Sequence, residues 1–506
     1  AIVGSFLSSR IALGVGRDLR NLVFERVEDY SLHEFDKLGT ASLVTRTTND
    51  IIQIQTVLVM GMRFMVSAPI MCIGGIIMAW SRDKSLTLLL AVVLPLMLAF
   101  IGVVAVSIVP LFQVMQKKID RLNLVLRENL IGIRVIRAFN RLGSEQQRFM
   151  EANKDLTDNS IKVNKIMAMM QPIMMLFMNV TTVAIIWFAG LRIGDGQMEL
   201  GDMMAFMQYA MQIMFSLIMV TMMFVMIPRA QASAVRINEV LDMRPEINDT
   251  QNPIKADNKR GYVEFEDVTF SYPGAEEPAI SNISFSAKPG ETTAIIGGTG
   301  SGKSTLINLI PRFYDVDSGN IIIDGVNVRE LTQQDLRKKI GFVPQSIVLF
   351  SGTVAENIRY GKDDATKDEI EHAAEVAQAK DFIEGLSDGY DSQIAQGGTN
   401  ISGGQKQRLS IARALVRNPE IYIFDDSFSA LDFKTDGKLR AALKKETKDS
   451  TVIIVAQRVS TVMDADRIIV LDEGKIVGLG KHKELLNTCE VYHEIVSSQL
   501  SEEEIA

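Results

Sequence analysis

Four long apolar stretches in the first half of the chain constrain its fold more than any other feature. They cover approximately residues 56–80, 86–112, 166–190 and 203–228. A helix of about 20 apolar residues crosses the hydrocarbon core of a bilayer, and each stretch is long enough. A soluble core rarely needs four such runs. We therefore predict four membrane-spanning helices rather than buried core helices.

The basic residues indicate how these helices are oriented. Arg and Lys are frequent before the first stretch and between the second and third, whereas the short loops 81–85 and 191–202 carry little net positive charge. Since positively charged loops stay on the cytoplasmic side, both long segments and the second half of the chain are predicted to be cytoplasmic. We expect a multi-pass protein of the plasma membrane, the cell inner membrane.

The segments outside the apolar stretches are also informative. Residues 9–55 and 113–165 are charged and nearly free of Pro and Gly, so they are predicted to be helices continuing out of the membrane, with short helices at the breaks near 37–39 and 132. Residues 243–261 are polar and contain Pro245 and Pro253, which is typical of a linker. Beyond them, strand-like and helical runs alternate, which predicts an α/β domain.

Composition excludes several classes of protein. The chain has 2 Cys and 4 His, too few for a disulfide framework or a Cys/His zinc site. Its formal charge is −8 and no basic block stands out. Nucleic acid is therefore not expected to be a partner.

The motif "GGTGSGKST" directly follows the apolar run "TAII" and fits the phosphate-binding loop pattern in full. Its glycines let backbone N–H groups turn towards phosphate oxygens. Lys303 would reach the outer phosphates of a nucleotide, and Ser304 would ligate Mg²⁺. The candidate nucleotide-binding residues here are Gly297, Gly298, Thr299, Gly300, Ser301, Gly302, Lys303, Ser304 and Thr305.

Two further motifs complement this loop. In "IYIFDD" a buried strand ends in two acids. Asp425 would orient the water shell of Mg²⁺, and Asp426 would act as the base for the attacking water. In "ISGGQ" the residues Ser402, Gly403 and Gly404 form a second anion-binding helix start, although an ordinary N-capped helix would show the same pattern.

Together these motifs resemble the ABC transporter superfamily along essentially the whole chain. The ordered set is Tyr272 in "SYPG", the phosphate loop, Gln345 in "GFVPQ", "ISGGQ", "IYIFDD", and "SALD" ending at Asp432. The membrane part is similar to the exporter type, because "EFDKLGTASLVTRTTND" and "ENLIGIRVIRAF" match its two cytoplasmic loops. Exporters normally have six spans. The resemblance therefore implies that a first hairpin is missing. Residues 1–7 are apolar but too short to span, so they are expected to be the end of a helix.

The resemblance implies a fold and a set of roles. The fold is an all-α transmembrane domain with long cytoplasmic extensions over 1–245, followed by a cytoplasmic α/β P-loop ATPase domain over 246–506. ATP and Mg²⁺ are the implied cofactors. Tyr272 would stack on adenine, and Gln345 would link the γ-phosphate and Mg²⁺ to the membrane domain. The segment from Ser402 to Gln405, with Asp432 nearby, would contact ATP held by the opposite subunit.

Three positions depart from the family pattern. Asp426 stands where the family has Glu, Gln457 where it has His, and Gln396 where Glu is usual. Gln cannot carry the charge of an imidazole, and an acid shorter by one methylene is poorly placed. This pattern resembles the degenerate-site subunit of heterodimeric bacterial multidrug exporters, whose different partner would carry Glu and His. The alternatives are a slow homodimeric exporter and an ATP-gated regulatory or channel-type ABC protein.

Methionine is concentrated in the last two apolar stretches and offers flexible surface to apolar ligands. The residues are Met167, Met170, Met174, Met211, Met214, Met222 and Met223. Gln171, Asn179, Gln208 and Gln212 could add polar contacts in a central cavity, and helix packing alone would explain many of these residues. The expected cargo is amphipathic drugs or lipids, with a peptide as the alternative.

Overall fold

The computed structural model describes residues 2–254 and 261–500. The chain divides into two compact units, one comprising 1–28 and 39–243 and the other 29–38 and 244–506. The predicted Met222 and Met223 lie outside the described side chains.

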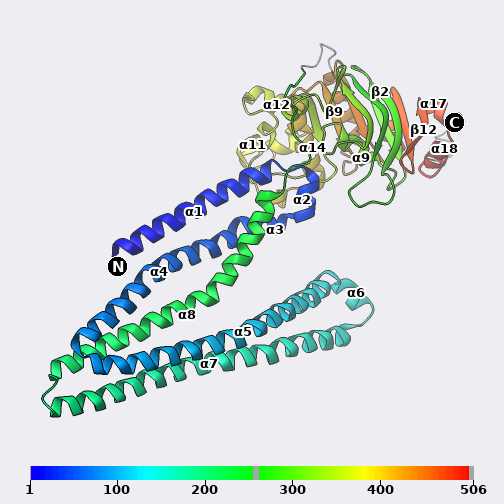
Figure 1. The fold of residues 1–506 in the computed structure, drawn as a ribbon. Helices are drawn as coiled ribbons and strands as arrows, with labels where there is room; N and C mark the ends of the chain where they lie inside the picture. Colours follow the sequence, from blue (N-terminus) through cyan, green and yellow to red (C-terminus); the bar gives the residue numbers. More distant parts are fainter. Residues whose placement is uncertain (1, 255–260, 501–506) are drawn as a thin grey trace. The chain divides into compact units, whose positions relative to one another are not determined.

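The first unit consists of helices. They are α1 (Ile2–Glu28), α3 (Thr40–Thr45), the π-helical turn η1 (Arg46–Asp50), α4 (Ile51–Arg82), α5 (Lys84–Ile131), α6 (Ile133–Ala138), α7 (Leu142–Gly194) and α8 (Leu200–Asp242). In Figure 1, α4 lies beside α8 and α5 beside α7. Within the part of the chain that the structure describes, four helical segments are long and apolar enough to cross a membrane: Thr40–Arg82, Lys84–Ile131, Leu142–Gly194 and Leu200–Val220. Each of these segments contains or overlaps one of the four apolar stretches predicted to span the membrane.

The predicted extensions and breaks are also present. The helices α5 and α7 continue well beyond their apolar stretches, and Gly132 ends α5 so that the short helix α6 forms the tip of the hairpin (Figure 1). Another short helix, α2 (Leu32–Leu38), precedes Gly39, whose φ is 73°. The last span continues to Asp242, and the described part of the linker, 243–254, forms no helix or strand.

A buried ion pair joins the turn η1, which leads into α4, to α8. Asp50 is 2% exposed and accepts hydrogen bonds from Arg236 and, at 2.9 Å, from Ser233 Oγ. Arg46, on the same π-helical turn, donates to the Arg236 carbonyl oxygen at 3.0 Å and pairs with Glu239 at 2.7 Å. Because an unpaired buried carboxylate is costly, these contacts specify how the two helices pack.

We expect Arg236→Ala to destabilise the transmembrane unit by about 2 kcal/mol, because it leaves Asp50 buried without its main cation while Arg236 itself is half-exposed. Thermal unfolding in detergent measures the effect. Arg229→Ala, at an exposed position of the same helix, is the control. Equal unfolding temperatures for the two variants would contradict the assigned role.

The second unit contains α2 and an α/β domain with two main sheets. The antiparallel sheet has the order β2 (Ile280–Ala287), β1 (Val263–Phe270), β4 (Ser318–Ile323), β5 (Val326–Asn327). The other has the order β12 (Lys475–Gly480), β11 (Arg467–Asp472), β3 (Thr292–Gly297), β10 (Thr451–Val455), β9 (Ile421–Asp425), β6 (Ile340–Val343). Five of these six strands run parallel, and β12 is antiparallel.

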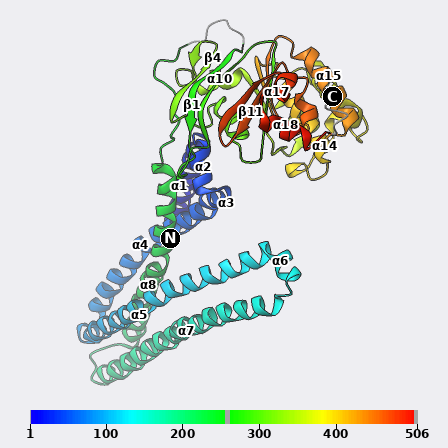
Figure 2. The same ribbon diagram turned by 90° about the vertical axis from the view of Figure 1, so that its right-hand side faces the viewer.

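The other described elements of this domain are helices, short turns and a pair of short strands (Figure 2). The helices are α9 (Lys303–Leu309), α10 (Gln333–Lys338), α11 (Val354–Arg359), α12 (Lys367–Val376), α13 (Lys380–Glu384), α14 (Gly403–Leu415), α15 (Phe433–Glu446), α16 (Val459–Val462), α17 (His482–Thr488) and α18 (Glu490–Ser497). The short strands β7 (Gly352–Thr353) and β8 (Gln393–Ile394) pair with each other.

The strand β9 is buried on both faces, which explains its unbroken apolar sequence. Ile421 and Ile423 belong to the apolar cluster shared with β1, β2 and α9. Tyr422 and Phe424 belong to the cluster shared with α12, α14 and α15. Alternate side chains thus enter two cores, as expected for a parallel strand between covering layers. The strand delivers its terminal acids to one edge of the sheet.

Candidate functional site

The predicted nucleotide-binding residues meet at the carboxyl edge of the six-stranded sheet. The adjacent parallel strands β3, β10, β9 and β6 end at this edge, where ligands usually bind in α/β sheets. Their loops contribute a cavity of about 380 Å³. The lining includes Tyr272, Thr299, Gly300, Gly302, Lys303, Ser304, Thr305, Gln345, Asp425, Asp426 and Gln457.

The phosphate loop depends on glycine at two positions. Gly302, the N-cap of α9, has φ 93°, and a Cβ there would lie 2.7 Å from Ile280 Cγ2. A Cβ on Gly297 would lie 2.1 Å from the Leu471 carbonyl oxygen. Only glycine combines these close approaches with the left-handed conformation at 302.

Lys303 places its ammonium group inside this loop. Its Nζ donates to the carbonyl oxygens of Gly297 at 2.9 Å and Gly298 at 2.6 Å. Burial lowers the pKa of Lys303, while Asp425 and Asp426 act in the opposite direction. The ammonium group therefore lies between the phosphate loop and the two acids, a position from which it can contact an anionic ligand.

Asp425 and Ser304 form a pair of oxygen donors. Asp425 is 6% exposed, and its Oδ1 accepts a hydrogen bond from Ser304 Oγ at 3.2 Å. Burial raises the pKa of Asp425, whereas Ser304 and Lys303 act to lower it. Mg²⁺ takes one or two protein oxygens together with water and phosphate oxygens. This donor pair therefore fits Mg²⁺.

Asp426 has a distinct environment. Its φ is 47°, a left-handed conformation that Asp adopts more readily than Glu. Its Oδ2 accepts a hydrogen bond from Gln457 Nε2 at 3.3 Å. Burial raises the pKa of Asp426, and Ser429, Arg458, Lys303 and Gln345 oppose that increase. Two of the three residues that depart from the pattern of the resembled family, Asp426 and Gln457, therefore contact each other.

Tyr272 lies at the side of the same cavity. Its hydroxyl is 3.0 Å from Thr305 Oγ1. Its ring packs edge-on against Phe270 and Tyr314, with centroid separations of 5.1 Å and 5.5 Å. The ring is 37% exposed, so it retains surface on which a planar ligand can pack.

The "ISGGQ" segment forms a separate surface. Ser402 is the N-cap of α14, its Oγ accepts from Gln405 N at 3.3 Å, and Gln405 Oε1 accepts from Ser402 N at 2.8 Å. This is the N-capped helix that the sequence allowed. A hollow of about 480 Å³ there is lined by Ser402, Gly403, Gly404, Arg408, Ala430, Leu431, Asp432 and Thr435. The lining of this hollow shares no residue with that of the Lys303 cavity.

The sequence motifs did not identify several residues that support the site. Gln407, 5% exposed, accepts a hydrogen bond from Ala430 N at 3.1 Å and so joins α14 to the loop after Asp426. Arg458 Nη2 donates to the Ser429 carbonyl oxygen at 3.1 Å. Gln407 lies just after the "ISGGQ" motif, which is the only sequence signal for it.

Gln396 is exposed on the 3₁₀ turn η3 (Gln396–Gly398).

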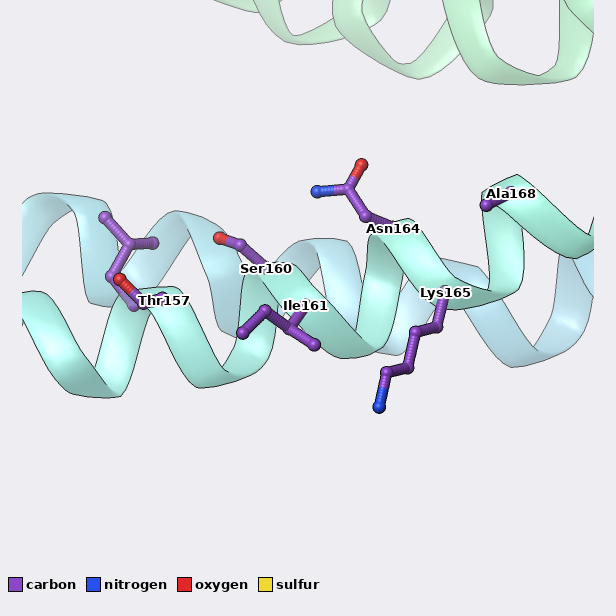
Figure 3. A pocket seen from close by; sticks show the side chains of 7 residues that line it. Thr157, Ser160, Ile161, Asn164, Lys165 and Ala168 are labelled. Carbon is purple, nitrogen blue, oxygen red and sulfur yellow. The ribbon is translucent and has the colours of Figure 1, made fainter.

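A further hollow of about 520 Å³ lies along α7 (Figure 3). Its lining comes from one helix and includes Ser160, Ile161, Asn164 and Lys165, which project in different directions. Because no second element supplies converging groups, this hollow does not make a catalytic site.

The comparisons with known proteins agree with this geometry. The family model for the ABC transporter transmembrane region matches residues 1–217, and the ABC transporter model matches 280–429. An uncharacterized ABC transporter ATP-binding protein of Mycobacterium bovis is 46% identical over 99% of this chain and 86% of its own length. A fatty acid ABC transporter ATP-binding/permease protein of the same organism is 36% identical over 94% of this chain and 75% of its own length.

Among solved structures, a bacterial Atm1-family ABC exporter with ATP bound is similar, with a TM-score of 0.81 and 28% identity over 97% of this chain and 86% of that one. The helical transmembrane domain and the α/β ATP-binding domain are those of a transport ATPase in the inner membrane, with the ATP-binding domain in the cytoplasm. The chain therefore belongs to the ABC transporter family and is of the exporter type.

Proposed function

We propose that this chain is one half of a heterodimeric exporter, in which it holds ATP at a weakly hydrolysing site and completes the active site of a different partner. One observation carries the proposal. The phosphate loop, Lys303, Ser304 and Asp425 line one cavity with the residue types that bind a nucleotide, whereas the two proposed hydrolytic positions hold Asp426 and Gln457, which contact each other at 3.3 Å.

The binding residues would divide the nucleotide between them. Tyr272 would pack on the adenine, and the loop N–H groups would surround the phosphates. Lys303, which donates to loop carbonyl oxygens in this structure, would turn to the outer phosphates. Ser304 and Asp425 would hold Mg²⁺, which when bound neutralises charge on the β- and γ-phosphate oxygens. Gln345, which lines the same cavity, would sense the γ-phosphate.

The geometry also explains why hydrolysis would be slow. Breaking the bond between the γ-phosphorus and its bridging oxygen requires a water whose oxygen attacks the phosphorus and whose proton goes to a base. The carboxylate of Asp426 is one methylene short of the usual base, and Gln457 donates to it. A misplacement of about 1 Å can lower a rate about a hundredfold.

A different role is proposed for the surface formed by Ser402, Gly403, Gly404 and Asp432. It lies in its own hollow, away from Lys303. Backbone N–H groups at the start of the 13-residue helix α14 are available to an anion there. We propose that this surface binds the phosphates of ATP held by the partner.

The proposed cargo is an amphipathic lipid, with an amphipathic drug as the alternative within the same class. Met174 and Met214 are buried together with Met97, so helix packing accounts for them. Met167 and Met211 are exposed, and offer the apolar surface that such a cargo needs. The similarity to a fatty acid ABC transporter supports a substrate with an acyl chain.

We predict that Asp426→Glu combined with Gln457→His raises ATP hydrolysis at this site about ten- to a hundredfold, because the longer acid reaches the attacking water and the imidazole contacts the γ-phosphate. The left-handed backbone at 426 costs Glu on the order of 1 kcal/mol, which the domain tolerates. The measurement is the ATPase rate of the purified transporter, with the partner's hydrolytic acid replaced.

Asp426→Asn with Gln457→His is the matched control, since it adds the imidazole without a base, and it should show no increase. The subunit composition is determined on the same sample. A second, different ABC chain supports the heterodimer. A sample containing this chain alone, with ATPase activity that Asp426→Ala abolishes, would refute the proposal in favour of a slow homodimer.

A further inference from the structure

The side chain of Gln499 bridges the loop that carries Gln457. Its Oε1 accepts a hydrogen bond from the backbone N–H of Val459 at 2.9 Å. Its Nε2 donates to the backbone carbonyl oxygen of Gln457 at 2.8 Å. One side-chain amide therefore satisfies a backbone acceptor just before Arg458 and a backbone donor just after it.

The loop has a specific need for these bonds. Strand β10 ends at Val455, and α16 begins at Val459. The first N–H groups of a helix have no partner within it, and the N-cap residue of α16, Arg458, provides no side-chain cap. Gln499, 40 residues further along the chain, caps the Val459 N–H instead.

Gln499 is exposed, but the residues around it are anchored to the domain. It follows α18, which contacts β3 and β11 and lies beside β11 in Figure 2. Tyr492 and Val496 on that helix are fully buried, and Leu500 packs against the same apolar cluster. The backbone N–H groups of Gln499 and Leu500 both donate to the Val496 carbonyl oxygen, at 3.0 Å and 2.9 Å. Gln499 thus lies between two packed apolar residues, Val496 and Leu500.

The bridge leads directly to the hydrolytic positions. Gln499 holds the backbone of Gln457, and the side chain of Gln457 donates to Asp426 Oδ2 at 3.3 Å. We propose that Gln499 is a positioning residue that sets where residue 457 stands relative to residue 426 and the γ-phosphate. The segment that follows α18 is then part of the hydrolytic apparatus. The inference rests on the proposed role of position 457.

The first test is amide hydrogen exchange of the loop 456–460 in the purified transporter. Gln499→Ala removes both bonds and is expected to speed exchange of the Val459 N–H at least about tenfold, since a lost local bond opens the loop. Ser498→Ala, on the adjacent exposed residue, is the control and should leave exchange unchanged. Unchanged exchange in Gln499→Ala would overturn the proposal.

The second test separates positioning from simple capping. The carboxylate of Gln499→Glu can still accept from the Val459 N–H but faces the Gln457 carbonyl oxygen with a lone pair. We expect it to keep slow exchange at Val459 and yet to lower kcat about as much as Gln499→Ala does. If Gln499→Glu kept both slow exchange and full kcat, the contact with the Gln457 carbonyl would have no positioning role.

The kinetic measurement is made in the Asp426→Glu/Gln457→His background, where this site is expected to turn over. There Gln499→Ala should lower kcat about tenfold and leave KM for ATP unchanged. In the Asp426→Glu/Gln457→Ala background, Gln499→Ala should no longer lower kcat. An equal loss of kcat in this second background would overturn the proposal. If Asp426→Glu/Gln457→His hydrolyses ATP no faster than wild type, the proposed function fails independently of this inference. The effect of Gln499→Ala on kcat is then measured in the wild-type chain.

Discussion

Gly404→Asp is expected to lower ATP turnover by the assembled transporter at least about a hundredfold, the effect typical of removing an essential transition-state contact. A Cβ at 404 would lie 3.1 Å from the Ala430 carbonyl oxygen. A carboxylate there adds negative charge to the surface that we propose binds the phosphates of ATP held by the partner. The measurement is the steady-state ATPase rate of the transporter in detergent or lipid nanodiscs.

The comparison with Asp426→Ala makes this prediction specific. That variant should change total turnover by no more than about twofold, because in the proposed heterodimer Asp426 would serve the weak site and Gly404 the strong one. Gly437→Ala is the control, since a Cβ at 437 meets no atom within 4 Å. ATP binding at the Lys303 site of Gly404→Asp shows whether the domain is folded. If Asp426→Ala stopped turnover and Gly404→Asp kept it, the asymmetric mechanism would be wrong.

Lys303→Ala should weaken ATP binding at this chain's own site at least about a hundredfold, because the triphosphate loses a charge-assisted contact worth about 3 kcal/mol. Asp425 and Asp426 would also lose the neighbouring cation that favours their charged forms. Two carboxylates would then face the phosphates without their nearest cation.

Photolabelling of the separated subunit with an azido-ATP analogue measures this loss. Lys338→Ala, at an exposed lysine of the same domain, is the matched control and should label like wild type. Undiminished labelling of Lys303→Ala would show that the triphosphate binds elsewhere.

The spans and the order of the motifs were determined by the sequence alone. Four apolar stretches of membrane length are suited to cross a bilayer as helices, because a helix satisfies all its backbone hydrogen bonds internally. The phosphate loop could also be predicted from a short segment. The left-handed φ of Gly302 and the start of α9 at Lys303 both involve neighbouring residues. Ser402 as an N-cap follows from its own sequence context in the same way.

The contacts between distant segments were decided by the tertiary structure. The segment 29–38 belongs to the unit of the ATP-binding domain, where Glu34 Oε1 accepts a hydrogen bond from Glu246 N at 3.1 Å across more than two hundred residues. The sequence showed a short helix there and nothing of its partner. A single buried carboxylate gives no periodic signal that would reveal which distant N–H it meets.

The same holds within the site. The sequence showed that Asp426 and Gln457 depart from the family pattern, and the adjacent ends of β9 and β10 bring them within 3.3 Å. It gave no sign of Gln499, because an amide near the end of a chain resembles any exposed polar residue. Local chemistry was therefore readable from the sequence. The pairing of groups far apart in the chain depended on how strands and helices pack, since it is packing that brings their polar atoms within hydrogen-bonding distance.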